Sequence, residues 1–497
     1  MSGILLDQPA PGATTCIVIG AVPKTGIPTL QRYRSVLWWI DSASSTPFPA
    51  GFAPDRTQVA RLEHDDFAQT LDRFIRLNPR QLPSLVVTHG IEGAHATDYE
   101  RLISETHRLL ESTHRTRFTR QQDGFTWQKH VLQNAPAYAR HRLPDAWAGA
   151  LRGLPACICG AGPSLEVSLA KLVAAANHAV IFSADSALRA LARHGVRADF
   201  AASIDIAKIP DKCLPPDSAF VPARVVLASV SPPAWQQAMP ADRQFFLSGN
   251  QLTDDWFATQ GVARTKIAVA DSCGSTAIEL ALHLGCGPIY LFGLDLAVDA
   301  ANQAKRHQQD ADPALYKNSR YDPTAQLPRV PGNYAETVPC FALGDWHDLD
   351  ARLAAQAEVQ VFNVNDRGAR LRGTTLVHPD RFSFSPPTAV KSDRLAKLSA
   401  ASSSEVAAIS ALKKLHAIGL RCDQALPGLR NAFTRGGPAA LAEAFRPLLL
   451  DPEIGRPFGA FALKLMPHLI PPIEGDGELW RSLLREFEEL VRLARSV

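Results

Sequence analysis

The stretch 155–165, with the sequence PACICGAGPSL, constrains the fold of this chain most strongly. Its apolar first half predicts a buried strand, and Gly160 and Gly162 predict a tight turn. Pro163 suits the first turn of a helix, where no backbone N–H is needed. A strand, a glycine turn and a helix start together form an anion site, because exposed N–H groups and the helix dipole attract negative charge. We therefore expect Gly160, Gly162 and Ser164 to cradle a phosphate, with an ordinary tight turn as the alternative.

The next predicted strand, 179–184, is followed by an acidic residue, Asp185. In Rossmann folds an acidic residue near this distance binds a ribose hydroxyl, so NAD has to be considered. Leu165 stands where the third glycine of the NAD fingerprint belongs, and this disfavours NAD against another nucleotide. We expect Asp185 and Ser186 to hold ribose or sugar hydroxyls. The alternative is that they cap the following helix, 187–193.

The chain contains five short sequence blocks between residues 154 and 297, and both their order along the chain and their approximate spacing are informative. They are CGAGPSL (159–165), DSAL (185–188), GVRADFAASID (195–205), DSCGSTA (271–277) and GCGPIYLFGLDLA (285–297). In this order they resemble the central domain of the motility accessory factor (Maf) family. Phe125–Trp127, Asn134 and the stretch 361–373 extend the resemblance to both sides of the central domain.

The Maf family is similar to bacterial sialyltransferases that use CMP-activated nonulosonic acids. The resemblance implies transfer of a sialic-acid-like sugar, such as pseudaminic or legionaminic acid, to Ser or Thr of flagellin, in support of flagellum assembly and motility. The CMP-sugar is then the donor substrate, and no separate cofactor is expected. The same domain also resembles an archaeal-type 6-hydroxymethylpterin diphosphokinase, so phosphoryl transfer remains an alternative. A flagellin-binding accessory protein without catalytic activity is the third interpretation.

Further candidate residues follow the later predicted strands. In a parallel sheet, ligands bind beyond the carboxyl ends of the strands, where Gly160, Asp185, Asp205 and the turn 293–295 are all expected to lie. Asp205 ends a strand and is expected to act in catalysis. The turn with Ser272, Gly274 and Ser275 precedes an apolar helix at 277–284 and is expected to contact the ligand. The alternative for this turn is an ordinary N-cap made by its serine or threonine side chains, Ser275 or Thr276.

Gly293 and Asp295 follow the strand 288–292 and predict a turn that faces the sugar or the acceptor, with Asp295 in a catalytic role. Sialyltransferases carry tyrosines here, whereas this chain has Leu296 and Ala297. His307 lies in the loop that follows, where the resemblance implies a catalytic histidine, and its ordinary pKa suits a general base.

Metal independence is expected, because no Asp-x-Asp pair stands at a strand end of the central domain. Asp348-Leu-Asp350 is interpreted as a helix start. Under the diphosphokinase alternative, Asp185, Asp205 and Asp295 would hold Mg²⁺.

With 497 residues the chain is longer than one hydrophobic core normally supports. Alternating strands and helices predict an α/β fold with a Rossmann-like, doubly wound central domain. The expected order is an N-terminal α/β domain (1–120), a helical linker (121–153), the central glycosyltransferase domain (154–385) and a helical C-terminal domain (386–497). The C-terminal apolar stripes predict either an internal core or a docking surface for flagellin. The predicted strands are 15–20, 35–41, 84–89, 155–159, 179–184, 199–205, 224–229, 287–292 and 359–364, and the predicted linker helices are 97–113 and 127–140.

The charge of the chain is nearly balanced, with 52 basic and 49 acidic residues, and it does not favour a nucleic acid or a membrane surface as partner. The N-terminus lacks a basic segment followed by an apolar one, and we find no run of about 18 apolar residues. A cytoplasmic location is therefore expected. The eight cysteines contain no Cys-x-x-Cys pair and are interpreted as buried thiols.

Overall fold

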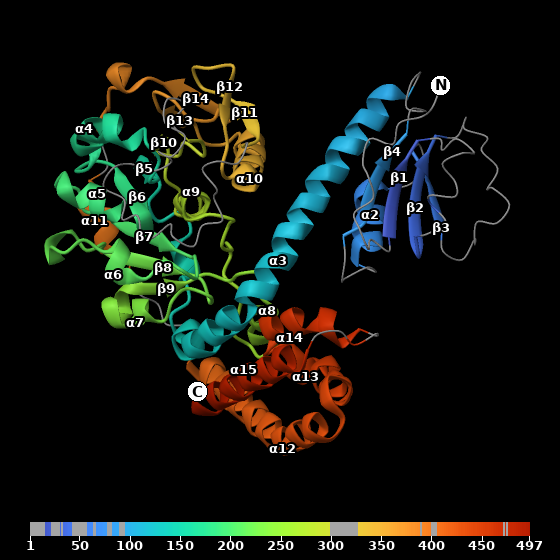
Figure 1. Ribbon diagram of the computed structural model, residues 1–497. Helices are drawn as coiled ribbons and strands as arrows, with labels where there is room; N and C mark the ends of the chain where they lie inside the picture. Colours follow the sequence, from blue (N-terminus) through green and yellow to red (C-terminus); the bar gives the residue numbers. More distant parts are fainter. Residues whose placement is uncertain are drawn as a thin grey trace. The chain divides into compact units, whose positions relative to one another are not determined.

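The structure is a computed structural model that forms two compact units, Met1–Gln122 and Asp123–Val497 (Figure 1). The residues described are 15–20, 30, 33–41, 57–62, 66–76, 82–88, 95–298, 327–387, 390–398, 405–470, 473 and 476–497.

The first unit contains a four-stranded sheet with the order β3-β2-β1-β4. Its strands pair in parallel, and the sequences of β1, β2 and β4 are nearly continuously apolar because both faces of these strands are buried. Ile17 packs into the core on one face, and the neighbouring Val18 packs into the core on the other. The three strands predicted in this region are confirmed. The elements are β1 (Thr15–Ile19), β2 (Ser35–Ile40), β3 (Thr57–Arg61), α2 (Phe67–Arg76) and β4 (Ser84–Val87).

One long helix, α3 (Ala96–Arg140), runs from the first unit into the second. The prediction of two separate helices at 97–113 and 127–140 was wrong, because the intervening residues contain no proline to stop the helix. Gly124 within this stretch lies close to the C-terminal helices, where a Cβ would come 2.9 Å from the Cβ of Lys464.

The second unit is built on an eight-stranded sheet with the order β14-β13-β10-β5-β6-β7-β8-β9. Neighbouring strands pair in parallel. From β5 the chain adds strands in one direction up to β9 and then returns to place β10 on the other side. The switch point therefore lies between β5 and β10, the place where open α/β sheets bind ligands. The strands are β5 (Ala156–Cys159), β6 (Val180–Ala184), β7 (Phe200–Ser203), β8 (Arg224–Leu227), β9 (Gln244–Phe246), β10 (Ile289–Phe292), β13 (Val361–Val364) and β14 (Thr374–Val377).

Helices cover both faces of this sheet, as the doubly wound prediction requires. Leu169 of α4 shares a core with Cys157 of β5, whereas Ile278 of α9 packs on the opposite face with Ile158. The Rossmann-like fold class is thereby confirmed. The remaining elements around the sheet are α4 (Leu165–Ala175), α5 (Leu188–Arg193), α6 (Pro210–Cys213), α7 (Ala234–Ala238), α8 (Leu252–Thr259), α9 (Cys273–His283), β11 (Arg329–Pro331), β12 (Thr337–Pro339), α10 (Leu343–Ala355) and α11 (Lys391–Ala396).

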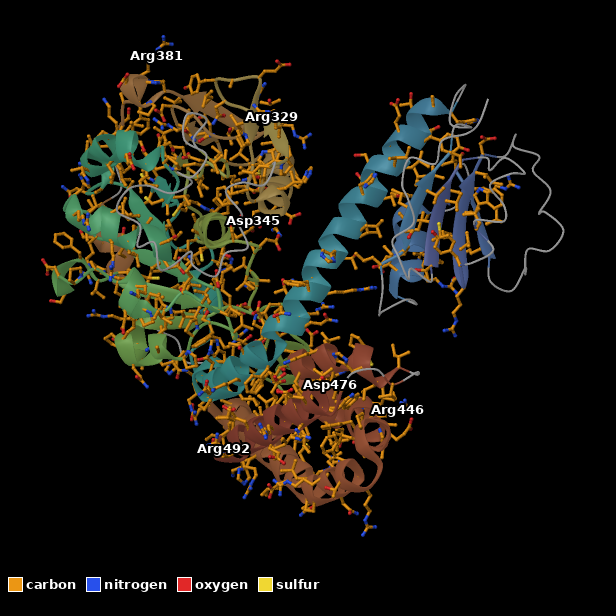
Figure 2. The ribbon with its side chains drawn as sticks, viewed as in Figure 1. Arg329, Asp345, Arg381, Arg446, Asp476 and Arg492 are labelled. Carbon is orange, nitrogen blue, oxygen red and sulfur yellow. The ribbon has the colours of Figure 1, made fainter. Side chains whose placement is uncertain are left out.

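The C-terminal part is helical, as predicted. Phe445 and Phe487 form an edge-to-face pair with ring centroids 5.3 Å apart between its two long helices. Asp476 caps the last helix by accepting a hydrogen bond from the Leu479 N–H, and exposed Arg492 carries charge on its surface (Figure 2). The helices are α12 (Glu405–Leu450), which is kinked at Gly437, α13 (Pro452–Gly455), α14 (Gly459–Leu465) and α15 (Gly477–Ser496).

No helix in the described parts of the chain is both long and apolar enough to cross a membrane.

Candidate functional site

The glycine turn after β5 packs directly against the turn after β10. The Gly160 N–H donates to the Phe292 carbonyl at 2.8 Å, and the Gly162 N–H donates to the Gly293 carbonyl at 2.8 Å. A Cβ on Gly160 would lie 2.4 Å from the Gly293 oxygen, and one on Gly162 would lie 2.7 Å from it. The glycines are therefore required because two backbones approach each other. Their amides do not form the predicted phosphate cradle, because both N–H groups already have protein acceptors.

The Asp295 carboxylate joins the ends of three strands. It accepts hydrogen bonds from the Ser164 N–H at 2.7 Å and from the Asn365 side chain at 2.9 Å, and the Ser164 hydroxyl also donates to it. Burial raises the pKa of Asp295, and the hydrogen bonds from Ser164 and Asn365 oppose this rise. In this geometry the Ser164 and Asp295 side chains are buried and bind each other, which favours a positioning role for them over the predicted phosphate contact and catalytic role. Gly293, with a φ of 64°, serves the same junction rather than the predicted sugar contact.

Asp185 is a buried carboxyl group at the end of β6, and its exposed fraction is 1%. Its oxygens accept hydrogen bonds from the Ser186 N–H at 2.7 Å and from the Ser203 hydroxyl at 2.8 Å. Burial raises the pKa of Asp185 to about 6, while the positive charge of Lys208 and the two hydrogen bonds oppose the rise. Asp205 raises the pKa further by charge repulsion. A carboxyl group whose pKa is shifted towards neutral pH by burial and by a neighbouring charge is a candidate functional group.

Asp205 follows β7 and is exposed to solvent. It accepts a hydrogen bond from the Ala207 N–H at 2.8 Å, which holds the carboxylate in a local turn. Because β6 and β7 are neighbours, the structure brings Asp205 into electrostatic range of Asp185. The pairing of these two acids at the carboxyl edge agrees with the sequence expectation. Lys208, which the sequence analysis did not select, adds a positive charge to the same group.

The N-terminus of α9 reaches this pair of acids. The Cys273 thiol donates to Asp185 with a sulfur–oxygen distance of 3.6 Å. The Ser272 hydroxyl accepts from the Ser275 N–H at 3.0 Å and caps the helix. The predicted helix start at Ala277 was therefore four residues too late, and Ser272, not Ser275 or Thr276, provides the cap.

Gly274 has a packing role at the same helix start. Its Cβ would lie 2.6 Å from the Leu294 side chain, which also lies against Gly160. Ser275 is buried and hydrogen-bonded to Ser272. Contacts from Gly274 and Ser275 to a ligand remain a prediction.

Other sequence predictions have different outcomes. His307 lies outside the described residues. Asp350 does not lie at a helix start, because α10 begins at Leu343. The buried Asp350 carboxylate accepts hydrogen bonds from the backbone N–H and from the guanidinium of Arg372, each at 2.7 Å. The sequence analysis did not select Ser203 or Asn365. Ser203 ends β7 and binds Asp185, and Asn365 follows β13 and binds Asp295. Their positions at strand ends could have indicated them.

Comparisons with known proteins agree with this architecture. The family model described as "6-hydroxymethylpterin diphosphokinase MptE-like" matches residues 129–300. Among solved structures, the chain is similar to the MAf glycosyltransferase from Magnetospirillum magneticum AMB-1, with a TM-score of 0.55 and 16% sequence identity. The match covers 99% of this chain and 80% of that one. No curated protein sequence matches. The resemblance predicted from the sequence blocks is confirmed at the level of the fold: this chain has the fold of the Maf glycosyltransferase, and its residues 129–300 match the MptE-like family model.

Proposed function

We propose that this protein is a glycosyltransferase that moves a nonulosonic acid from a CMP-activated donor to a Ser or Thr hydroxyl of flagellin. The likeness in fold to a glycosyltransferase, the MptE-like domain and the sequence blocks support the proposal. The observation that carries it is the cluster of Asp185, Asp205, Lys208 and the α9 N-terminus at the carboxyl edge of the sheet. This edge is where doubly wound folds bind their substrates.

The proposed reaction assigns separate tasks to these residues. The acceptor oxygen forms a bond to the anomeric carbon of the sugar, and the bond from that carbon to the phosphate oxygen breaks. CMP leaves with the bonding electron pair, and the hydroxyl proton passes to a base. Asp205 is exposed and takes the proton in our proposal, while Asp185 orients the acceptor or the sugar. Lys208 and the positive end of α9 stabilise the charge that develops on the phosphate.

The turn residues around Asp295 support the site without reacting. Asp295, Ser164 and Asn365 hold the loops after β5, β10 and β13 in one arrangement. This arrangement places Leu294 against Gly274 at the start of α9. We therefore assign Asp295 a positioning role. His307, the general base that the resemblance implies, lies outside the described residues and is the alternative to Asp205 as proton acceptor. Flagellin remains the predicted acceptor of the sugar.

Phosphoryl transfer to a pterin is the second candidate, because the description of the matching family model names a diphosphokinase. That reaction uses Mg²⁺ with ATP. In the described residues, no group of three His, Cys, Asp or Glu side chains is placed to hold a metal ion. Asp295 binds Ser164 and Asn365, so the three aspartates do not form the Mg²⁺ site considered from the sequence.

Titration calorimetry separates the two functions. Full-length protein is titrated with CMP, CDP, ATP and NAD, each with and without Mg²⁺. We expect CMP to bind in both conditions. Binding of ATP that depends on Mg²⁺, without binding of CMP, would reject the glycosyltransferase proposal in favour of phosphoryl transfer.

A further inference from the structure

Three arginines gather at the amino edge of the central sheet, opposite the candidate active site. Arg197 precedes β7, Arg224 is the first residue of β8, and Arg243 precedes β9. These strands are parallel neighbours, with Phe200 paired to Arg224 and Val225 paired to Gln244. Parallel pairing therefore places the three guanidinium groups at one edge, although they are far apart in the sequence.

The arginines line a cavity of about 340 Å³. Asp242 is the only acid among the described residues that line it, so three positive charges face one negative charge. A cavity of this volume is at the lower end of the range for small-molecule sites. The other lining residues are Ala223, Phe245 and Leu398.

Protein contacts hold two of these side chains in place. The Arg224 guanidinium lies over the rings of Trp147 and Phe200, 5.7 and 5.4 Å from their centroids, and donates to the Leu395 carbonyl at 3.1 Å. The Arg197 Nε donates to the Val221 carbonyl at 2.8 Å. Fixed guanidinium groups lose little freedom when they bind an anion.

The positive charges repel one another in the folded protein. Burial lowers the pKa of Arg224, and Arg243 and Arg197 lower it further. Asp199 opposes this effect, but its carboxylate is shared with Lys391 at 2.7 Å and with the Ile181 N–H at 2.7 Å. An anion in the cavity would relieve the repulsion directly.

We propose that this cavity binds a phosphate group, as inorganic phosphate or as a phosphate monoester, at a second site remote from the carboxyl edge. Guanidinium groups match the oxygens of phosphate through paired hydrogen bonds. A dianion balances the net charge of the four charged residues that line the cavity. The cavity therefore recognises the phosphate group itself and not a base or sugar attached to it.

Calorimetry on the full chain tests the site with inorganic phosphate and, separately, with glycerol phosphate. Each titration is repeated with sodium chloride at matched ionic strength. We expect Arg197→Gln and Arg243→Gln each to weaken phosphate binding at least tenfold. Asp242→Asn should tighten binding several-fold, because it removes the one opposing charge. Arg485→Gln changes an exposed arginine on α15 and should have no effect.

Circular dichroism confirms that each variant is folded before its affinity is compared. Binding of only one of the two probes identifies the source of the phosphate group. The proposal is overturned if both arginine variants retain wild-type affinity, or if chloride produces the same response as phosphate. CMP binding does not enter this test, so failure here leaves the proposed glycosyltransferase function intact.

Discussion

A buried carboxyl group at the end of a strand costs stability when it is ionised, and Asp185 is such a group. Its pKa is raised to about 6 from an ordinary value near 3.8. As the pH rises from about 4 to about 6, the unfolded chain has released a proton that the folded protein still holds. The free energy of unfolding therefore decreases across this window. The full penalty, about 3 kcal/mol as an order of magnitude, is present above pH 6.

Asp185→Asn should remove this penalty. The amide oxygen can accept from the Ser186 N–H while the amide NH2 donates to the Ser203 hydroxyl oxygen, so we expect the variant to be at least as stable as the wild type at pH 7. Its stability should also vary less between pH 4 and 6. Transfer activity should nevertheless fall sharply, since an amide replaces the carboxylate that is proposed to orient the acceptor or the sugar. Urea unfolding at several pH values checks the first part, and a variant with full activity would remove Asp185 from the mechanism.

Gly162 provides a second test at the same scale. A side chain there meets Asp295 and the Gly293 carbonyl, so Gly162→Ala should destabilise the protein by about 1–3 kcal/mol. Gly428 in α12 has open space around it, with no neighbouring atom within 4 Å of where a Cβ would lie, and Gly428→Ala should be neutral or stabilising. Chemical denaturation compares the two. If the Gly162→Ala protein has wild-type stability but has lost affinity for CMP, the result would instead support the predicted phosphate cradle.

At the scale of single elements, helix α9 connects the cap at Ser272 to the acids of the site. The cap fixes the first turn, in which Cys273 contacts Asp185 and Gly274 packs on Leu294. The helix start therefore determines both the stability of α9 and the surroundings of Asp185.

Ser272→Ala should cost about 1 kcal/mol of stability, because the Ser275 N–H loses its acceptor. Ser272→Asp keeps an acceptor and should restore that stability. The added carboxylate lies near Asp185 and Asp205, so donor binding should still weaken in this variant. Thermal unfolding and CMP titration measure the two effects, and equal CMP affinity in all three proteins would exclude a ligand near Ser272.

At the scale of the whole molecule, the C-terminal helices share a core with the elements around the sheet. Leu132 of α3, Phe257 of α8 and Phe458 belong to one buried cluster. Gly459 permits close contact, since its Cβ would lie 2.4 Å from the Cβ of Leu252. Much of the apolar surface considered for flagellin docking is therefore used inside the second unit.

A fragment of residues 1–404 should consequently lose cooperative unfolding and expose apolar surface that binds a hydrophobic dye. A fragment of residues 123–497 keeps the second unit and should unfold cooperatively. Calorimetry and dye fluorescence compare the fragments. Cooperative unfolding of 1–404 would show that the C-terminal helices are dispensable for the fold and free to serve another purpose.

The amino-acid sequence by itself determined the fold class and the inner strands of the two parallel sheets, whereas the edge strands β3, β9 and β14 were not predicted. Apolar runs such as 155–159 and 35–41 predict buried strands because burial on both faces requires continuous apolar sequence. The sequence also predicted that Asp185 and Asp205 would lie at one edge, because the carboxyl ends of parallel strands share an edge.

Only the tertiary structure decided what the glycines and Asp295 do. Gly160 and Gly162 have the pattern of a phosphate loop, but their N–H groups bind the turn after β10, which is more than 130 residues away in sequence. The arginine cavity arises in the same way, from neighbouring strands. The local sequence pattern indicates which conformations a segment favours. The partner of each hydrogen-bond donor and of each charged side chain depends instead on which distant segments pack beside it.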